Sequence, residues 1–276
     1  MKRVGYQGVK GAFSEAALFD YYGKNIEAVG LESFEDVFEA LKTGKIDAAI
    51  LPFENSIAGT IAINYDLLYT ENSIKVIGET FHRIDHHLLT HKGNHLTSIK
   101  RVYSHPLALA QCRDFIKQHN LKAMPEYDTA GAAKIVSERK NPEEAVIASS
   151  LAAEIYNMDL LVRGIESNKF NYTRFLILVR SENVPDNLPA DKTSIVFKTK
   201  HFPGALVNCL QRFSKNSVNL TKLESRPVPE DPFQYMFYAD FEGGLHEERV
   251  KLSLNEVEAV CEFMKILGSY PKGKMR

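Results

Sequence analysis

The feature that most constrains the fold is a unit that recurs along the first two thirds of the chain. In each copy an apolar strand is followed by a short polar segment and then by a helix. Residues 46–51 and 145–148 are apolar enough to be strands buried on both faces, and residues 101–103 form a shorter strand. Strands that alternate with helices predict an α/β fold.

Polar side chains gather where these strands end and where the next helices begin. In open α/β sheets, ligands bind outside the carboxyl ends of the strands. These places hold hydroxyls, amides and free backbone N–H groups but few charges, which suits a small polyanion held by dipoles and hydrogen bonds. The candidates that follow strands or cap helices are Glu54, Asn55, Ser104, Gln111, Thr129 and Ser149.

The segment Asn171-Tyr172-Thr173-Arg174-Phe175 runs directly into the apolar strand 176–179. An amide, a hydroxyl and a guanidinium at a strand end are well placed to project into a cleft. Ordinary turn hydrogen bonds and a surface ion pair explain the same residues. Neighbouring residues on a strand face opposite sides, so Thr173 and Arg174 are not expected to point into one cleft together.

Composition excludes several classes of protein. A formal net charge of -1 leaves no basic excess for nucleic acid or an anionic membrane. Three cysteines far apart give neither a disulfide framework nor a zinc spacing, and no stretch reaches the ~20 apolar residues of a membrane helix. The N-terminus lacks an export signal, which predicts a cytoplasmic protein.

Five histidines crowd residues 82–95 and suggest a metal site at first sight. No carboxylate or cysteine stands at ligand spacing, and alternating histidines on a strand point to opposite faces, so no metal is expected. The glycines after the first strand do not have the spacing of a nucleotide-binding loop.

A second region follows the polar, proline-containing segment 181–189, which has the composition of a linker. Strands are expected at 193–198, 218–226 and 234–241, with helices at 204–216 and 254–267 and at most a short last strand. This order is typical of a ferredoxin-like α+β unit.

Together these segments resemble one family, the prephenate dehydratases with a C-terminal ACT regulatory domain. The resemblance covers essentially the whole chain, and its six segments stand in the family's order. They are Tyr6-Gln7-Gly8 with Gly11-Ala12-Phe13-Ser14-Glu15, Pro52-Phe53-Glu54-Asn55-Ser56, Ser104-His105-Pro106 with Gln111, Asn171-Tyr172-Thr173-Arg174-Phe175, Gly204-Ala205-Leu206, and Glu224-Ser225-Arg226-Pro227.

The resemblance implies an α/β catalytic region of two lobes, similar to type II periplasmic binding proteins, with the active site between the lobes. The catalytic domain would span residues 1–182, with one lobe at about 1–80 and 161–182 and the other at about 81–160. The ferredoxin-like ACT domain would span residues 191–270.

The implied activity is the decarboxylating dehydration of prephenate to phenylpyruvate in L-phenylalanine biosynthesis, without cofactor or metal. The family's threonine acts at the leaving hydroxyl, and that role falls on Thr173. Glu54, Asn55, Ser104 and Gln111 match further catalytic positions, and Glu54 remains a possible proton source. Residues expected to bind substrate are Ser14, Thr129, Ser149, Asn171 and Arg174.

In the last region the resemblance implies a site for L-phenylalanine as a feedback inhibitor, and a homodimer or homotetramer. The site would use Gly204, Ala205, Leu206, Glu224, Ser225, Arg226 and Pro227. The chain departs from the family's usual pattern at Asp128, Glu166 and Phe170. Two other functions remain open: an arogenate dehydratase, or a two-lobed amino-acid sensor without catalysis.

Overall fold

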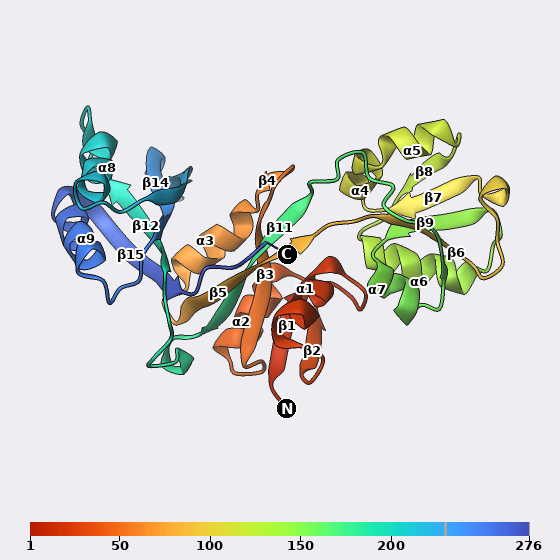
Figure 1. Ribbon diagram of the computed structural model, residues 1–276, viewed down its shortest axis with the longest axis horizontal. Helices are drawn as coiled ribbons and strands as arrows, with labels where there is room; N and C mark the ends of the chain where they lie inside the picture. The colour runs from red at the N-terminus through yellow and green to blue at the C-terminus, as the bar shows by residue number, and fades with distance from the viewer. Residues whose placement is uncertain (229–230, 276) are drawn as a thin grey trace. The chain divides into compact units, whose positions relative to one another are not determined.

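The computed structural model describes residues 1–228 and 231–275 (Figure 1). By its contacts the chain divides into two compact units. The first unit holds residues 1–64 and 80–175, and the second holds residues 65–79 and 176–274. Three elements carry the chain from one unit into the other: α3 (Ala62–Thr70), β5 (Ile74–Arg83) and β11 (Tyr172–Arg180).

The N-terminal part of the first unit is a parallel sheet. Strand β1 (Arg3–Gln7) lies between β2 (Glu27–Leu31) and β3 (Ala48–Asn55), and the short β4 (Gly59–Thr60) pairs antiparallel with β3. Helices α1 (Phe13–Tyr22) and α2 (Phe34–Lys42) connect these strands. Helix α2 begins with a capping box in which Ser33 and Asp36 bond each other's backbone N–H groups at 3.1 Å.

A second sheet in the same unit has the order β10-β6-β9-β7-β8. Its strands are β6 (His87–Thr90), β7 (Arg101–Ser104), β8 (Lys122–Pro125), β9 (Glu144–Ala148) and β10 (Asp159–Val162). Its helices are α4 (Pro106–Gln111), α5 (Arg113–Gln118), α6 (Thr129–Arg139) and α7 (Ser150–Ile155). Val146 and Ile147 belong to different apolar clusters, so β9 is buried on both faces, as its composition predicted.

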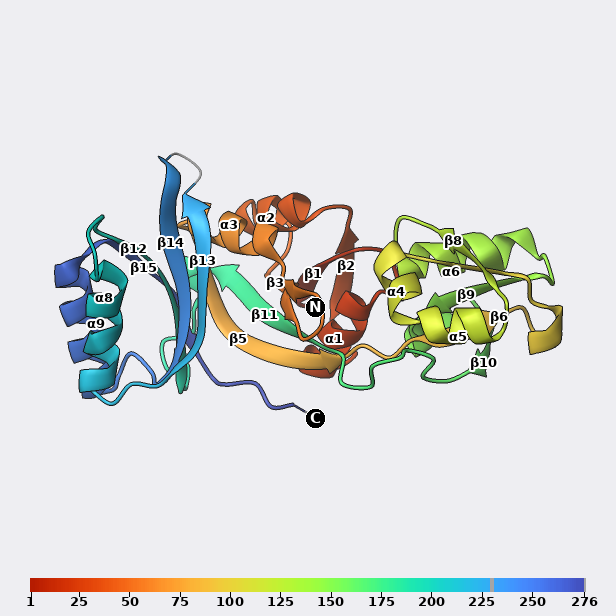
Figure 2. The same ribbon diagram turned by 90° about the horizontal axis from the view of Figure 1, so that it is seen from above.

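The second unit contains the order β12 (Lys192–Thr199), α8 (Ala205–Lys215), β13 (Leu220–Val228), β14 (Asp231–Glu242), α9 (Glu248–Val260) and β15 (Cys261–Tyr270). The sheet order is β13-β14-β12-β15, and β15 pairs in parallel with β5 at Gly268 and Val76. Helices α8 and α9 lie side by side on one face of this sheet (Figure 2). Phe197, Phe213, Phe241 and Val250 form the core between these layers.

The prediction of a helix over 254–267 was wrong at both ends, because the helix begins at Glu248. Helix α9 ends at Val260, and Cys261 begins a strand of 10 residues. Residues 261–270 mix apolar and polar types in a way that fits either state. Pairing with β12 along the whole strand decides the outcome, because β15 then completes the sheet and buries Leu267.

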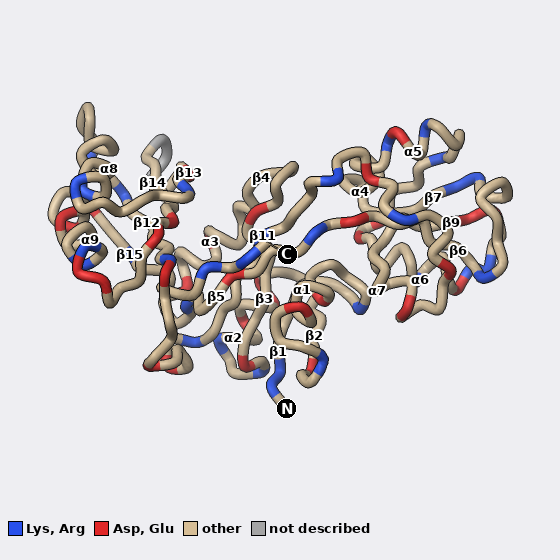
Figure 3. The backbone as a smooth tube through the Cα atoms, in the orientation of Figure 1, with Lys and Arg blue, Asp and Glu red and all other residues tan. Residues whose placement is uncertain are grey.

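Charges of both signs are interspersed along the backbone (Figure 3). Among residues 1–228 and 231–275, no helix is long and apolar enough to span a bilayer. The same residues include no group of three or more histidine, cysteine, aspartate or glutamate side chains placed to hold a metal ion.

Candidate functional site

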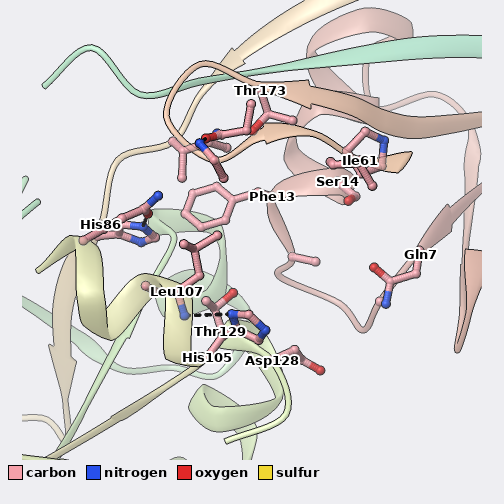
Figure 4. A pocket seen from close by; sticks show the side chains of 18 of the residues that line it. Gln7, Phe13, Ser14, Ile61, His86, His105, Leu107, Asp128, Thr129 and Thr173 are labelled. Atoms are coloured by element: carbon pink, nitrogen blue, oxygen red, sulfur yellow. Dashed lines mark hydrogen bonds between the residues drawn. The ribbon is translucent and has the colours of Figure 1, made fainter. Parts of the chain in front are cut away.

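The first unit contains a cavity of about 280 Å³ at the ends of its strands (Figure 4). Its wall includes the C-terminal end of β1, the end of β3, the segment between β5 and β6, and the start of β11. The lining residues are Gln7, Gly8, Ala12, Phe13, Ser14, Pro52, Asn55, Ala58, Ile61, Ile84, His86, His105, Leu107, Ala108, Gln111, Asp128, Thr129, Thr173 and Phe175.

Three helices begin at this cavity. Helix α1 starts after Ala12, which has no side chain to cap it, and helix α4 starts after His105, whose Nδ1 accepts the Leu107 N–H at 3.1 Å. Helix α6 starts after Asp128, whose carboxylate accepts the Gly131 N–H. Each helix N-terminus carries a partial positive charge of roughly half an elementary charge. None of the lining residues is lysine or arginine.

A network of side-chain amides crosses the wall of the cavity. Asn55 Oδ1 accepts the backbone N–H groups of Ile57 at 3.0 Å and Ala58 at 2.8 Å. Its Nδ2 therefore donates to Asn171 Oδ1 at 2.8 Å and to Thr173 Oγ1 at 3.0 Å. Because backbone N–H groups only donate, they fix which end of the Asn55 amide faces Thr173.

The network continues from Asn171 to helix α4. Asn171 Nδ2 donates to Gln111 Oε1 at 3.2 Å, and His86 Nε2 lies 2.7 Å from the same oxygen. Asn171 is only 1% exposed and Thr173 only 7%. The structure thus brings together Asn55, Gln111, Asn171 and Thr173, four of the residues that the sequence singled out. We call these four, with His86, the amide network.

Strand alternation separates Thr173 from Arg174, as the sequence argument anticipated. Thr173 and Phe175 line the cavity, whereas Arg174 does not, and its Nη1 lies 3.8 Å from Glu54 Oε2. Glu54 is also absent from the lining. Their predicted roles at the substrate therefore lack support from their position.

Two predicted serines serve the local framework. The buried Ser104 Oγ donates to the Ile147 carbonyl at 2.6 Å. Ser149 Oγ donates to the Gly11 carbonyl at 2.7 Å and accepts the Ala152 N–H at 3.1 Å, which caps α7. Neither serine lines the cavity, whereas Ser14 and Thr129 do.

The sequence argument missed several lining residues, and His86 and Phe13 are the most informative. Their rings meet edge to face at 5.4 Å between centroids. His86 was set aside with its neighbouring histidines when no metal spacing was found. Its place just beyond a strand, within the polar end of the sheet, is the signal that would have found it.

The segments predicted to bind phenylalanine lie in the second unit. Gly204 precedes α8 with a φ of 84°, and Gly204, Ala205 and Leu206 line a hollow of about 510 Å³ formed by residues 199–207. Glu224, Ser225, Arg226 and Pro227 lie on β13 and are not part of that lining. Arg226 is paired with Asp66 of α3 at 2.5 Å.

Known proteins identify the family. The family model described as prephenate dehydratase matches residues 4–183. The arogenate dehydratase/prephenate dehydratase 2 of Arabidopsis thaliana is 40% identical, over 98% of this chain and 72% of its own length. A solved prephenate dehydratase from Arthrobacter aurescens in complex with L-Phe is 31% identical, with a TM-score of 0.87 over 97% of this chain and 89% of that one.

A further solved structure, GqqA, is described as a novel type of quorum quenching acylase. It is 33% identical, with a TM-score of 0.89 over 98% of both chains. The matching family model and a relative that aligns with 98% of this chain confirm the predicted resemblance to prephenate dehydratases. The chain belongs to the prephenate dehydratase family.

Proposed function

We propose that the protein converts prephenate to phenylpyruvate. As CO2 leaves the ring, the electron pair of the broken C–C bond moves into the ring and expels the hydroxyl on the opposite carbon. The departing hydroxide takes up one proton and becomes water, and the ring becomes aromatic. The enzyme must therefore stabilise negative charge on the leaving oxygen while leaving the ring carboxylate free to depart.

The position of the Thr173 hydroxyl is the observation that carries this proposal. Its Oγ1 accepts from Asn55 Nδ2 at 3.0 Å, so its own proton is available to another acceptor. Thr173 lines the cavity, which supports a role as donor to the leaving oxygen of a bound substrate. Loss of one preorganised donor to a developing oxyanion typically costs about 10²–10³-fold in kcat.

The cavity is suited to a dianion that must lose one carboxylate. The starts of α1 and α6, with the hydroxyls of Ser14 and Thr129, offer dipoles and hydrogen bonds to a carboxylate. A guanidinium bound to the departing carboxylate would stabilise the ground state and oppose decarboxylation. Arg174, directed away from the wall and beside Glu54, satisfies this requirement.

Asp128 favours a second candidate substrate, arogenate. Arogenate has an ammonium group where prephenate has its keto group, and a carboxylate on the cavity wall can pair with it. In Asp128→Asn the amide oxygen can still cap α6. If Asp128 selects arogenate, this variant lowers kcat/KM for arogenate and leaves that for prephenate within about threefold. Equal losses on both substrates would remove the argument for arogenate.

We further propose that residues 191–270 form an ACT domain that binds L-phenylalanine and inhibits the enzyme, and that residues 1–182 form the catalytic domain. The order of strands and helices from β12 to β15 and the hollow beside Gly204 support this assignment. The L-Phe complex of the Arthrobacter relative supports the choice of ligand. A homodimer or homotetramer is part of the same proposal, since ACT domains are expected to bind their ligand in pairs.

The decisive experiment measures phenylpyruvate formation from prephenate, with and without L-phenylalanine, for the wild type, Thr173→Ser and Thr173→Val. Serine keeps the hydroxyl, whereas valine keeps the shape and loses it. We expect the serine variant to retain activity within about tenfold and the valine variant to lose about 10²–10³-fold. Arogenate is tested in parallel, and so is an N-acyl amide, because the similar structure GqqA is described as an acylase. A folded wild type that turns over neither prephenate nor arogenate would overturn the proposal.

A further inference from the structure

His86 stands at one end of the amide network and is not explained by the roles assigned so far. The residue is 2% exposed, and it lines the cavity beside Phe13 (Figure 4). Its Nε2 lies 2.7 Å from Gln111 Oε1. Its Nδ1 is buried and has no hydrogen-bond partner among the described residues. A buried imidazole with one nitrogen bonded and the other unpaired calls for an explanation.

The hydrogen bonds of the network determine which nitrogen of His86 carries the proton. The N–H groups of Ile57 and Ala58 require Asn55 to present Oδ1 to them and Nδ2 to Asn171. Asn171 then accepts through Oδ1 and donates through Nδ2 to Gln111 Oε1. Since that oxygen faces His86 Nε2, the His86 nitrogen must be the donor. His86 is therefore the Nε2–H tautomer, with a bare lone pair on Nδ1.

The surroundings of His86 keep the ring neutral. Burial lowers its pKa from the ordinary value, against the raising effect of the Gln111 bond and of the carboxylates of Glu166 and Asp85. His87 opposes the charged form as well. The carboxylate of Glu166 accepts the backbone N–H of His86 at 2.9 Å and is itself paired with Lys169. A proton on Nδ1 would gain no acceptor among the described residues.

The consequence for catalysis concerns Gln111. With its Oε1 occupied by two donors, Asn171 and His86, the Gln111 amide can turn only if both bonds break. Its Nε2–H2 group is then the part of the amide left to donate to a bound molecule, because Gln111 lines the cavity. Without the His86 bond, the Asn171 bond at 3.2 Å alone would hold the orientation.

We propose that His86 is a positioning residue for the dehydration reaction: as a neutral Nε2–H donor it locks the Gln111 amide so that the Nε2–H2 group faces the substrate. This inference rests on the proposed prephenate dehydratase activity. His86 itself transfers no proton, and its effect passes through Gln111.

Two substitutions separate the nitrogens of the ring. A glutamine side chain at position 86 places an amide N–H near the position of Nε2, whereas an asparagine side chain is too short and reaches only the position of Nδ1. We expect His86→Asn to lower kcat by about 10²-fold, the usual cost of misplaced catalytic groups, and His86→Gln to stay within about tenfold of the wild type. His95→Gln, at an exposed histidine, is the matched control and should leave turnover unchanged.

A double-mutant cycle with Gln111→Met distinguishes positioning from a general structural role. If His86 acts through Gln111, the loss of about 10²-fold on His86→Asn should shrink to less than about threefold when Gln111 is already absent. A cost that is the same in both backgrounds would overturn the inference, because the histidine would then be supporting the fold or contacting substrate itself. Thermal unfolding of each variant shows which losses reflect stability.

The tautomer is tested without any turnover. In long-range ¹H–¹⁵N spectra of the histidine-labelled wild type, His86 should show a protonated Nε2 and an unprotonated Nδ1 from about pH 6 to 8. A proton on Nδ1, or ordinary titration of His86, would overturn the inference. Wild-type protein with this tautomer but no turnover of prephenate would instead defeat the proposed function and leave the geometry intact.

Discussion

Asn55→Asp is the substitution that most directly tests the direction of hydrogen bonding in the amide network. The change replaces an NH2 group by an oxygen and alters almost no volume. The new carboxylate can still accept the N–H groups of Ile57 and Ala58. Its other oxygen, however, now faces Asn171 Oδ1 and Thr173 Oγ1, to which Asn55 donates at 2.8 and 3.0 Å. Two acceptors cannot share a hydrogen, so the network must reverse.

Reversal is possible at each position. Asn171 can rotate to donate to the new carboxylate, Gln111 can rotate to donate to Asn171 and His86, and the proton of His86 can move to Nδ1. Thr173 would then donate its hydroxyl proton to the carboxylate that replaces the Asn55 amide, 3.0 Å away in the present geometry, and no longer to the substrate. Only the new Nδ1–H of His86 would have no acceptor among the described residues, so the fold should survive with some loss of stability while the catalytic donor is lost.

The expected loss in kcat equals that of deleting an oxyanion donor, about 10²–10³-fold or ~2.7–4 kcal/mol of transition-state stabilisation. The free energy of unfolding should fall by about 1–3 kcal/mol, the cost of leaving the buried Nδ1–H of His86 without an acceptor. Steady-state kinetics on prephenate and urea unfolding measure the two quantities. An Asn55→Asp variant that keeps wild-type kcat would refute the reasoning. Asn94→Asp, which adds the same charge in the turn that follows β6, is the control.

Three further predictions concern stability. Lys192 Nζ lies 3.1 and 2.8 Å from the two oxygens of Glu79, whose side chain is fully buried. Lys192→Met leaves that carboxylate without its ion pair, so it should lower the free energy of urea unfolding by ~3–5 kcal/mol. The double variant Lys192→Met/Glu79→Leu should recover most of this loss. The lowered pKa of His86 means that, below about pH 6.5, the unfolded chain binds a proton that the folded protein does not. Stability should therefore fall as pH falls through that value, with a smaller slope in His86→Gln than in His95→Gln; equal slopes would contradict the pKa shift. Ser149→Ala should cost ~0.5–2 kcal/mol through the lost cap of α7 and leave KM unchanged, whereas a raised KM would show that the serine binds substrate after all.

The sequence predicted most members of the amide network correctly, but it did not predict which single polar residues line the cavity. Hydroxyls and amides at strand ends mark the correct edge of the sheet, because strand direction fixes where those ends meet. A serine that caps a helix and a serine that binds a ligand have the same composition and position in the sequence, so Ser104 and Ser149 could not be told apart from Ser14. Only the strand alternation of Thr173 and Arg174 carried information on direction, and the structure follows it.

His86 and β15 were missed for different physical reasons. The histidine cluster was tested only against metal-ligand spacing, and a hydrogen-bonding role depends on Gln111 and Asn171, which lie 25 and 85 residues away. For residues 261–270, local pattern fits helix or strand, and pairing with β12, which is distant in the sequence, decides. Long-range contacts of this kind leave no periodic mark on the sequence.

Helix α3 offers a route by which the second unit can act on the cavity. At its N-terminal end, the Asn64 Nδ2 donates to the Pro52 carbonyl at 2.7 Å, and Pro52 lines the cavity. The rest of the helix is held by residues of the second unit, of which Arg226 binds Asp66 through two guanidinium nitrogens at 3.3 and 2.5 Å. Asn64 and Asp66 belong to the same continuous helix, and we propose that a shift at Asp66 would reach Asn64 along it.

Asp66→Asn tests this route, because it removes the charge that Arg226 holds and keeps the size of the side chain. If phenylalanine acts through β13, the variant should keep its kcat without inhibitor within about twofold of the wild type. The L-phenylalanine concentration that gives half inhibition should rise. A typical allosteric coupling of about 1–3 kcal/mol corresponds to a factor of about 5–150, which sets the upper limit of that rise. Asp186→Asn, at an exposed position of the linker, should change neither quantity. Coupling is reciprocal, so prephenate should weaken the binding of phenylalanine to the wild type. The same effect should be smaller in Asp66→Asn, and calorimetry of phenylalanine binding measures both. Unchanged inhibition with the Arg226 pair removed would mean that α3 does not transmit the signal.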